Sequence, residues 1–277
     1  MNSPNIGIIT PFRDAECFIE SYVLSLQNQT YRNWRCYLIN DFSTDNSLQL
    51  LKTLLTKDTR FTIIKETGSK KAIGPAKSRN IGIKYCKSDF LAFCDIDDLW
   101  HPRKLEIQIK YHIVNNLDIS VTGFCKFKNN ITSSKNFIFP PKKISYRSLL
   151  NYNQIPMLTV LLKRSYITKG FNNCRHEDYA LWLDILSNNK SIKIGTIDKI
   201  LAYYRIHNKN LSKNRIRMFI WTYEALSSHG ISGYRRIISI ISWTIYHLYF
   251  SLLSILVIRP LKYKVNELMN IEPLNKY

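Results

Sequence analysis

The sequence has few glycines, few prolines and few acidic residues for its length. Among 277 residues there are 9 Gly, 9 Pro and 20 Asp or Glu, while 45% of the residues are hydrophobic. So little glycine and proline excludes collagen-like repeats, and the hydrophobic fraction excludes a disordered chain. We therefore expect one large α/β domain, alone or with a small appendage.

The cysteine patterns of disulfide-bonded and zinc-binding proteins are also missing. Six cysteines are spread along the chain without a C-x-x-C pair or a metal-ligand spacing. This usage predicts reduced thiols in a cytosolic protein. The first residues lack a basic segment followed by an apolar run, so we expect no secretory signal and a cytoplasmic location.

Basic residues outnumber acidic ones by 40 to 20, which gives a net charge of +20. The excess is uneven, because residues 119–176 hold ten Lys or Arg and no acid. A charge of this size favours a polyanionic partner or an anionic membrane surface. A lysine-rich, solvated surface without any such role explains the excess equally well.

Short apolar runs alternate with helical patterns in the first half of the chain. Strands are predicted at residues 6–9, 36–39, 61–64 and 90–93, and helical stripes of apolar residues at 18–26, 48–55, 76–83 and 105–117. This order is typical of strand–helix units that close on a parallel sheet. Ligands of such sheets bind beyond the carboxyl ends of the strands.

Glycine-rich phosphate loops are absent after the first strand, so neither a dinucleotide fold nor a P-loop is supported. Instead, the fourth strand ends in Asp95-Ile96-Asp97-Asp98. Three carboxylates so close together repel one another unless a cation lies among them, and their hard oxygens suit Mg²⁺ or Mn²⁺ bound to a diphosphate. The alternative is an exposed acidic loop that caps the next helix.

Seven short segments resemble, in order, the motifs of family 2 glycosyltransferases with the GT-A fold. Phe12, Asn40 and Phe42 depart from the usual residues of these motifs. The segments are Ile8–Arg13, Ser25–Tyr31, Asn40–Asp45, Gly74–Gly82 (G-x-x-x-A-R-N-x-G, with Ser78 before the arginine), Asp95–Asp98 (D-x-D-D), His176–Trp182 (E-D-x-x-L-W) and Tyr204–His207 (Y-R-x-H). The resemblance implies an α/β fold with a mostly parallel central sheet flanked by helices. It covers residues 6–212, so we expect a catalytic domain at 1–215 and a C-terminal helical extension at 216–277.

The resemblance also implies a nucleotide site. Thr10, Pro11 and Phe12 are expected to line the base and ribose, with the Phe12 ring available for stacking. Asp41 is expected to accept a hydrogen bond from the imide N–H of uracil, which cytosine lacks. Arg79 is expected to reach the nucleotide or its phosphate. A turn or helix cap at Asp41 and a surface arginine at position 79 are the alternatives.

For the diphosphate, the resemblance implies a divalent metal, Mn²⁺ or Mg²⁺, bound by Asp97 and His207, with Asp95 contacting the ribose or the metal. A lone histidine is more often structural, and His207 stands out only through its Tyr-Arg-x-His context.

Asp178 is the expected general base, which takes the proton of the acceptor hydroxyl in an inverting transfer. Glu177 is expected to cap the helix that follows and to add a hydrogen bond to the acceptor.

The last apolar segment, Ile237–Ile258, carries no formal charge and is long enough to span a bilayer. Its polar residues gather on one helical face, which favours a helix in the membrane interface over a spanning one. A helix packed on the catalytic domain is equally compatible with the pattern. We expect a peripheral protein on the inner face of the cell membrane.

The predicted activity is metal-dependent transfer from a nucleotide-diphosphate sugar, most simply a UDP-sugar, to a glycan or a polyprenyl-linked saccharide acceptor in surface polysaccharide synthesis. No nucleic-acid partner is expected. Two alternatives stay open: a sugar-1-phosphate nucleotidyltransferase and a non-catalytic, basic nucleic-acid-binding protein. The first normally carries a glycine-rich, basic signature after strand one, which this sequence lacks.

Overall fold

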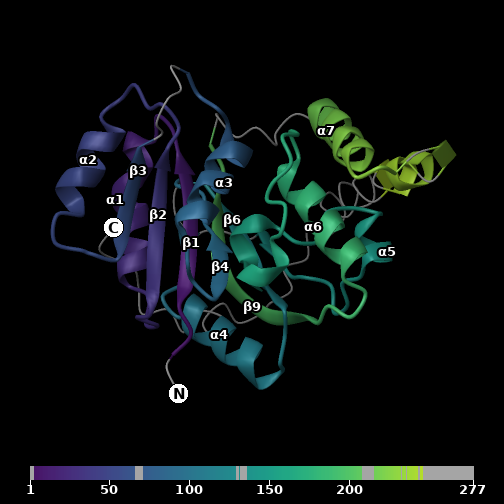
Figure 1. The fold of residues 1–277 in the computed structure, drawn as a ribbon, viewed down its shortest axis with the longest axis horizontal. Helices are drawn as coiled ribbons and strands as arrows, with labels where there is room; N and C mark the ends of the chain where they lie inside the picture. The colour runs from purple at the N-terminus through teal and green to yellow at the C-terminus, as the bar shows by residue number, and fades with distance from the viewer. Residues whose placement is uncertain are drawn as a thin grey trace.

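The computed structural model describes residues 3–65, 71–128, 131, 136–207, 215–231, 233–234, 236–242 and 244–245. Its first half alternates strands and helices as expected (Figure 1). The elements there are β1 (Ile6–Phe12), α1 (Glu16–Gln27), β2 (Trp34–Asn40), α2 (Ser47–Leu54), β3 (Phe61–Lys65), α3 (Pro75–Tyr85), β4 (Phe90–Phe93), β5 (Leu99–Trp100) and α4 (Lys104–Val114). The four predicted strands are confirmed, and β1 continues three residues further than expected.

The second half adds strands that the sequence patterns did not reveal. They are β6 (Ile119–Phe127), β7 (Asn136–Ile138), β8 (Val160–Lys163) and β9 (Ile194–Arg205), with helices α5 (Tyr146–Leu149), α6 (Glu177–Asn188) and α7 (Arg215–Ser228) and short 3-10 turns η1 (Met157–Thr159) and η2 (Arg164–Tyr166). The sheet runs in the order β3-β2-β1-β4-β8-β6-β9-β5, and β7 pairs with β6. Pairings among β1 to β4 are parallel, whereas β8 is antiparallel to both β4 and β6. The predicted α/β class is confirmed.

Alternate residues of β1 and β2 point to opposite faces of the sheet, where two hydrophobic cores lie. Ile9 and Ile39 contribute to one core, which includes residues of α3, α6 and α7. Ile8 and Leu38 contribute to the other, which includes residues of α1, α2 and α4. The period of two residues in a strand explains this division. In α4 the expected apolar stripe holds for Leu105 and Ile109, but Ile113 is 55% exposed.

Helix α3 lies so close to the sheet that Gly82 is required there. A Cβ atom at this position would approach Ile9 Cγ2 and Ile39 Cδ1 to 2.7 Å. The glycine that ends the Gly74–Gly82 motif therefore sets the height of α3 above β1 and β2, and with it the height of Arg79.

Beyond the sheet, α7 packs against α6, and Ala225 and Leu226 complete the core on that side. In Figure 1, α6 and α7 lie at the opposite end of the molecule from α2. No helix among the described residues is long and apolar enough to cross a membrane. Most of the predicted segment Ile237–Ile258 lies outside the described residues.

Candidate active site

Three aspartates form a tight turn directly after β4. The backbone N–H of Asp98 donates to the carbonyl oxygen of Asp95 at 3.0 Å, which closes the turn. The side chains of Asp95 and Asp97 remain 41% and 23% exposed, whereas Asp98 is buried. We call Asp95–Asp98 the acid turn. Two of its carboxylates are thus open to a ligand, and the third is internal.

The Tyr204–His207 motif holds the acid turn from the end of β9. The backbone N–H of Arg205 donates to Asp98 Oδ1 at 3.0 Å, and Arg205 Nε donates to the Asp97 carbonyl at 2.9 Å. His207 Nε2 lies 2.7 Å from Asp97 Oδ2. Asp98 therefore orients this turn, and the predicted pair of Asp97 and His207 is in direct contact.

Negative charge is concentrated at the acid turn. Burial raises the pKa of Asp97, and the charge of Asp95 raises it further, against the opposing effect of His207. Burial and the charges of Asp97 and Asp95 also raise the pKa of Asp98 well above its ordinary value. A cation at this turn would relieve the repulsion.

Arg79 joins the acid turn to the start of α6. Its Nη2 donates to Asp95 Oδ1 at 2.7 Å, and its Nη1 donates to Glu177 Oε1 at 2.6 Å. Burial alone would lower the pKa of Arg79, but the charges of Asp95 and Glu177 outweigh it and raise the pKa. We call these three side chains the arginine bridge.

The arginine bridge excludes the surface alternative for Arg79. The residue is only 5% exposed, so it is not a surface arginine. The two carboxylates take two of the five N–H donors of the guanidinium, so contact with a nucleotide stays a prediction. Its Nε is buried without a hydrogen-bond partner among the described residues.

Glu177 and Asp178 open α6 but are held differently. Burial raises the pKa of Glu177, and the Arg79 charge opposes this shift. Asp178 accepts hydrogen bonds from the side-chain amide of Asn153 at 3.0 Å and from the backbone N–H of Tyr179 at 2.7 Å. The ring of His176 lies 3.7 Å away, and burial lowers the pKa of His176, which favours the neutral imidazole. Asp178 is thus bound by neutral donors.

Two aromatic residues of α6 fix the segment that contains Asn153. Trp182 Nε1 donates to the Ile155 carbonyl, and the Tyr179 hydroxyl donates to the Leu149 carbonyl, both at 2.8 Å. The segment 153–160 thus lies against the first half of α6. The contact of Asn153 with Asp178 was not foreseen, because no pattern in the sequence links an isolated asparagine to a helix that begins 24 residues later.

Asn80 and Phe171 form a further contact that the motifs did not indicate. The Asn80 side chain donates to the Phe171 carbonyl at 2.9 Å and accepts from its backbone N–H at 2.7 Å. The Arg79 guanidinium lies 5.5 Å from the centre of the Phe171 ring. The Arg-Asn pair of α3 thus also binds the chain that leads into α6.

Two of the predicted nucleotide contacts are not supported by the structure. Thr10 is fully buried, and its hydroxyl bonds to that of Tyr22. Phe12 is 2% exposed and belongs to the core beneath α1, so its ring is not available for stacking. Both residues share the strand face of Ile8 because β1 extends to Phe12. Pro11, on the other face, is half-buried.

Asp41 lies at the end of β2 and binds the loop before α3. Its two oxygens accept the backbone N–H groups of Ile73 at 2.7 Å and Gly74 at 2.9 Å. Gly74 has a φ of 89°, which favours glycine at this turn. These bonds link residues that are 32 and 33 positions apart in the chain, so they are not the local turn or helix cap that was the alternative for Asp41. An ionised carboxylate has about four acceptor positions, so capacity remains for a ligand.

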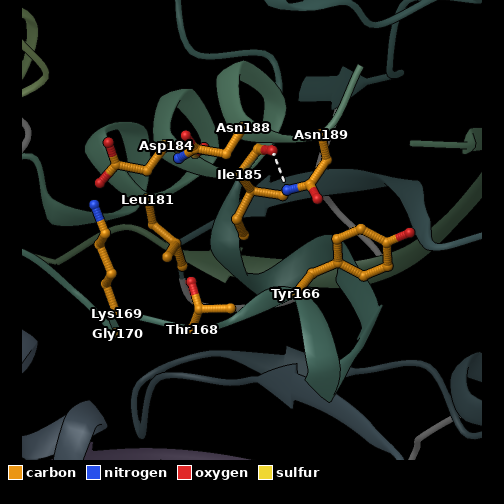
Figure 2. Close-up of a pocket in the computed structure, with 9 residues that line it drawn as sticks. All are labelled: Tyr166, Thr168, Lys169, Gly170, Leu181, Asp184, Ile185, Asn188 and Asn189. Atoms are coloured by element: carbon orange, nitrogen blue, oxygen red, sulfur yellow. Dashed lines mark hydrogen bonds between the residues drawn. The ribbon is translucent and has the colours of Figure 1, made fainter. Parts of the chain in front are cut away.

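A small pocket lies further along α6, away from its start. Figure 2 shows α6 residues Leu181, Asp184 and Ile185 facing the segment that includes Tyr166 and Thr168. None of the predicted site residues lines it. Within the described ranges, no three His, Cys, Asp or Glu residues are grouped closely enough to hold a metal ion by themselves. A metal at the acid turn would need ligand atoms from a substrate as well.

Comparison with known proteins identifies the class. Residues 7–160 match the family described as glycosyl transferase family 2. The Escherichia coli protein named UDP-Glc:alpha-D-GlcNAc-diphosphoundecaprenol beta-1,3-glucosyltransferase WfgD is 34% identical over 213 residues, which cover 76% of this chain and 81% of that protein. The chain belongs to glycosyltransferase family 2 and is an enzyme of the glycosyltransferase class.

Solved structures agree on the fold. S. aureus TarS 1-349 in complex with UDP-GlcNAc superimposes with a TM-score of 0.66 at 14% identity, covering 92% of this chain and 76% of that one. The mannosyltransferase PcManGT of Pyrobaculum calidifontis, in complex with GDP-Man and Mn²⁺, gives a TM-score of 0.64 at 14% identity, covering 87% and 69%. The predicted GT-A fold is confirmed. Family membership also favours a glycosyltransferase over the nucleotidyltransferase and nucleic-acid-binding alternatives.

Proposed function

We propose that this protein transfers a sugar, with inversion at the anomeric carbon, from a UDP-sugar to a hydroxyl of a lipid-linked saccharide in surface polysaccharide synthesis. The arginine bridge is the observation that supports this most. It connects a carboxylate at the end of β4, where a donor diphosphate would bind, with the acidic start of α6, where an acceptor would bind. Donor and acceptor groups are thereby held in one arrangement before substrates arrive.

In this proposal Asp178 is the general base. Its side chain is 22% exposed, so an acceptor hydroxyl can reach it. Neutral amide donors hold it, and burial favours the neutral form of the His176 imidazole beside it. A carboxylate within reach of the acceptor hydroxyl can serve as its general base. Glu177 orients the acceptor side. Its carboxylate forms an ion pair with Arg79, so it is Asp178 that is left to act on the reacting hydroxyl.

On the donor side, we propose that Asp41 and Pro11 contact the uracil and that Asp95 contacts the ribose or the metal. The backbone of Thr10 and Phe12 is the part of those residues that remains available. UDP is favoured because WfgD is named for a UDP-Glc donor and the TarS neighbour was solved with UDP-GlcNAc. Arg79 acts as a positioning residue between the two acids.

Mn²⁺ or Mg²⁺ fits the donor set of the acid turn. Asp97 and His207 offer a carboxylate and an imidazole side by side, and Asp95 offers a second exposed carboxylate. Mg²⁺ and Mn²⁺ accept one or two carboxylates together with substrate phosphate oxygens. When bound, such a metal neutralises the charge that develops on the departing diphosphate. The Mn²⁺ in the PcManGT structure supports the same assignment.

We further propose that residues 1–215 form the catalytic domain and 216–277 an extension that docks on it through α7. A lipid-linked acceptor, as in the name of WfgD, fits a cytoplasmic enzyme bound peripherally to the inner face of the membrane. The expectation of no nucleic-acid partner is part of this proposal.

A donor screen tests the function. Purified full-length protein is incubated with common UDP- and GDP-sugars, Mn²⁺ and a polyprenyl-diphosphate-linked saccharide, and release of UDP or GDP is measured. We expect acceptor-dependent UDP release and an anomeric configuration inverted relative to the donor. Tight oligonucleotide binding with a steep salt dependence, together with no UDP binding in Mn²⁺, would contradict the proposal.

A further inference from the structure

Helix α7 is apolar on two sides, although only one of them packs on the protein. Thr222, Ala225 and Leu226 are buried toward α6. A neighbouring side of the helix exposes four large side chains at helical spacing, namely Ile216 (73% exposed), Phe219 (39%), Ile220 (47%) and Tyr223 (44%). An amphipathic helix of a soluble domain normally presents polar residues on its solvent side. This exposed stripe therefore requires an explanation of its own.

The helix that follows continues the stripe. Residues 236–242 are helical, and the exposed side chains there are Ile237 (60%), Ile238 (56%) and Ile241 (51%), followed by Ile245 (60%). Ser239 is buried, and Ile240 packs against the main core. We call the exposed residues of both helices, from Ile216 to Ile245, the outer face.

Arg236 fixes the two helices relative to each other. Its Nη1 donates to the Tyr223 hydroxyl at 2.8 Å, and its guanidinium lies 4.8 Å from the centre of the Tyr223 ring. Its Nε donates to the Ile231 carbonyl at 2.7 Å, which closes the turn between the helices. Figure 1 shows both helices at the edge of the molecule, away from the sheet. The exposed stripes of the two helices are thus joined through the contact between Arg236 and Tyr223.

The charge around this surface is positive. Residues 215–245 contain four arginines and a single acid, Glu224, and Arg217 is exposed beside Ile216. A protein partner with a matching apolar patch would not require this excess, whereas anionic lipid headgroups above an apolar layer match both features. Each basic residue near such a surface adds about 1 kcal/mol of attraction.

The outer face is also close to the candidate base. On the inner side of α7, Thr222 Oγ1 lies 3.5 Å from His176 Nδ1, and His176 precedes the start of α6. Since α7 is about 10 Å wide with its side chains, the outer face lies within one helix width of that point. A surface that covers the outer face would lie one helix away from Asp178.

We propose that the outer face rests on an anionic membrane surface and so holds the start of α6 at the height of lipid-linked saccharides. The inference rests on the proposed function for its biological sense, but the binding surface itself is defined by the exposed residues of α7 and of the helix after it. Ile216, Phe219 and Ile220 lie before the segment Ile237–Ile258 and extend the membrane-contacting region into the helix that touches the acceptor side of the site.

Vesicle co-sedimentation of the full-length protein tests the surface without using activity. The vesicles are phosphatidylcholine alone and equimolar phosphatidylcholine with phosphatidylglycerol. The variant is Ile216→Glu with Ile220→Glu. The matched control is Val114→Glu with Ile113→Glu on α4, whose wild-type side chains are 73% and 55% exposed. Circular dichroism and a thermal melt check that both variants are folded.

We expect the wild type and the α4 control to bind the phosphatidylglycerol vesicles, and the α7 variant to bind at least about tenfold more weakly, because two apolar side chains leave the interface and two repelled charges enter it. The α7 variant should still release UDP with a water-soluble saccharide acceptor. Equal vesicle binding by both variants, or no binding by the wild type, would overturn the proposal. So would a change of oligomeric state of the α7 variant without vesicles, which would assign the outer face to a second copy of the chain.

A failed donor screen with intact vesicle binding would instead reject the proposed function and keep the membrane surface. The two proposals therefore fail separately.

Discussion

The acid turn and the start of α6 both present carboxylates to the candidate site, yet they hold them in opposite ways. At the acid turn, Asp97 and Asp98 crowd together, and burial and mutual repulsion raise their pKa values. At the start of α6, the two acids are separated in role, since Glu177 binds Arg79 and Asp178 binds neutral amides. The first arrangement favours a cation, and the second leaves Asp178 with neutral hydrogen-bond partners, as the proposed base requires.

The largest expected effect comes from removing the proposed base. Asp178→Asn keeps the shape and can still contact Asn153, but it cannot accept a proton. We expect transfer to fall about a hundredfold to ten-thousandfold, with UDP affinity changed less than about twofold. Initial rates and calorimetric titration measure the two quantities. The matched control is Asp184→Asn, two turns along the same helix, and a comparable loss of transfer there would point to disruption of α6 instead.

Breaking the arginine bridge should affect both regions at once. Arg79→Met leaves Glu177 buried without its cation, and removal of one partner of a buried pair costs about 3–5 kcal/mol. Loss of the ion pair with Asp95 adds little to this destabilisation because that carboxylate is 41% exposed. Urea unfolding measures the loss. In the double variant Arg79→Met with Glu177→Gln, part of the stability should return, and if none returns, Glu177 is not the residue that Arg79 neutralises.

The close packing of α3 gives a smaller effect. Gly82→Ala would place a Cβ 2.7 Å from Ile9 and Ile39, and overpacking of this kind costs about 1–3 kcal/mol. Lifting α3 also moves Arg79, so kcat should fall while UDP binding at Asp41 changes little. Gly230→Ala, where nothing lies within 4 Å of the added atom but φ is 81°, controls for backbone strain alone, and an equal loss of kcat in that variant would argue against the packing explanation.

The smallest effect concerns pH. The pKa of Glu177 is raised above its ordinary value of 4.5, with Arg79 opposing the shift, so Arg79→Met should raise it further. The native state then binds more protons than the unfolded state, and stability falls as pH rises from about 4.5 through the raised pKa, by at most about 1.4 kcal/mol per pH unit for one proton. Urea unfolding at several pH values should show a steeper decline for Arg79→Met than for the wild type. Adding Glu177→Gln should remove the extra slope, and a slope that persists would assign it to another group.

Much of the first half was predictable because its signals are local. Apolar runs marked β1 to β4, and the polar residues at their ends marked Asp41 and the acid turn. The misplaced residues were Thr10 and Phe12. Once β1 is seen to continue to Phe12, the period of two residues puts both on the buried face of Ile8. The error came from ending the strand at Ile9.

The second half was less predictable because its contacts join distant segments. The pairing of β8 with β4 and β6 depends on long-range register, which short windows do not contain. The partners of Arg79 lie on two other segments of the chain. Asn153 is held beside Asp178 because Tyr179 and Trp182 bind the backbone on either side of it. The order of the motifs identified the acidic residues. It did not show that Asp95 and Glu177 share Arg79, or that Asp178 has neutral partners.

The separate roles of the acid turn and the start of α6 are tested most directly by titrating UDP, with and without Mn²⁺, into Asp97→Asn and Asp178→Asn. The account predicts that Asp97→Asn loses the metal-dependent part of UDP binding, by about tenfold or more for a charge-assisted contact. It predicts that Asp178→Asn binds UDP and Mn²⁺ like the wild type although it no longer transfers sugar. If the two variants bind UDP equally well or equally poorly, with the same response to Mn²⁺, the acid turn and the start of α6 do not have the separate roles described here.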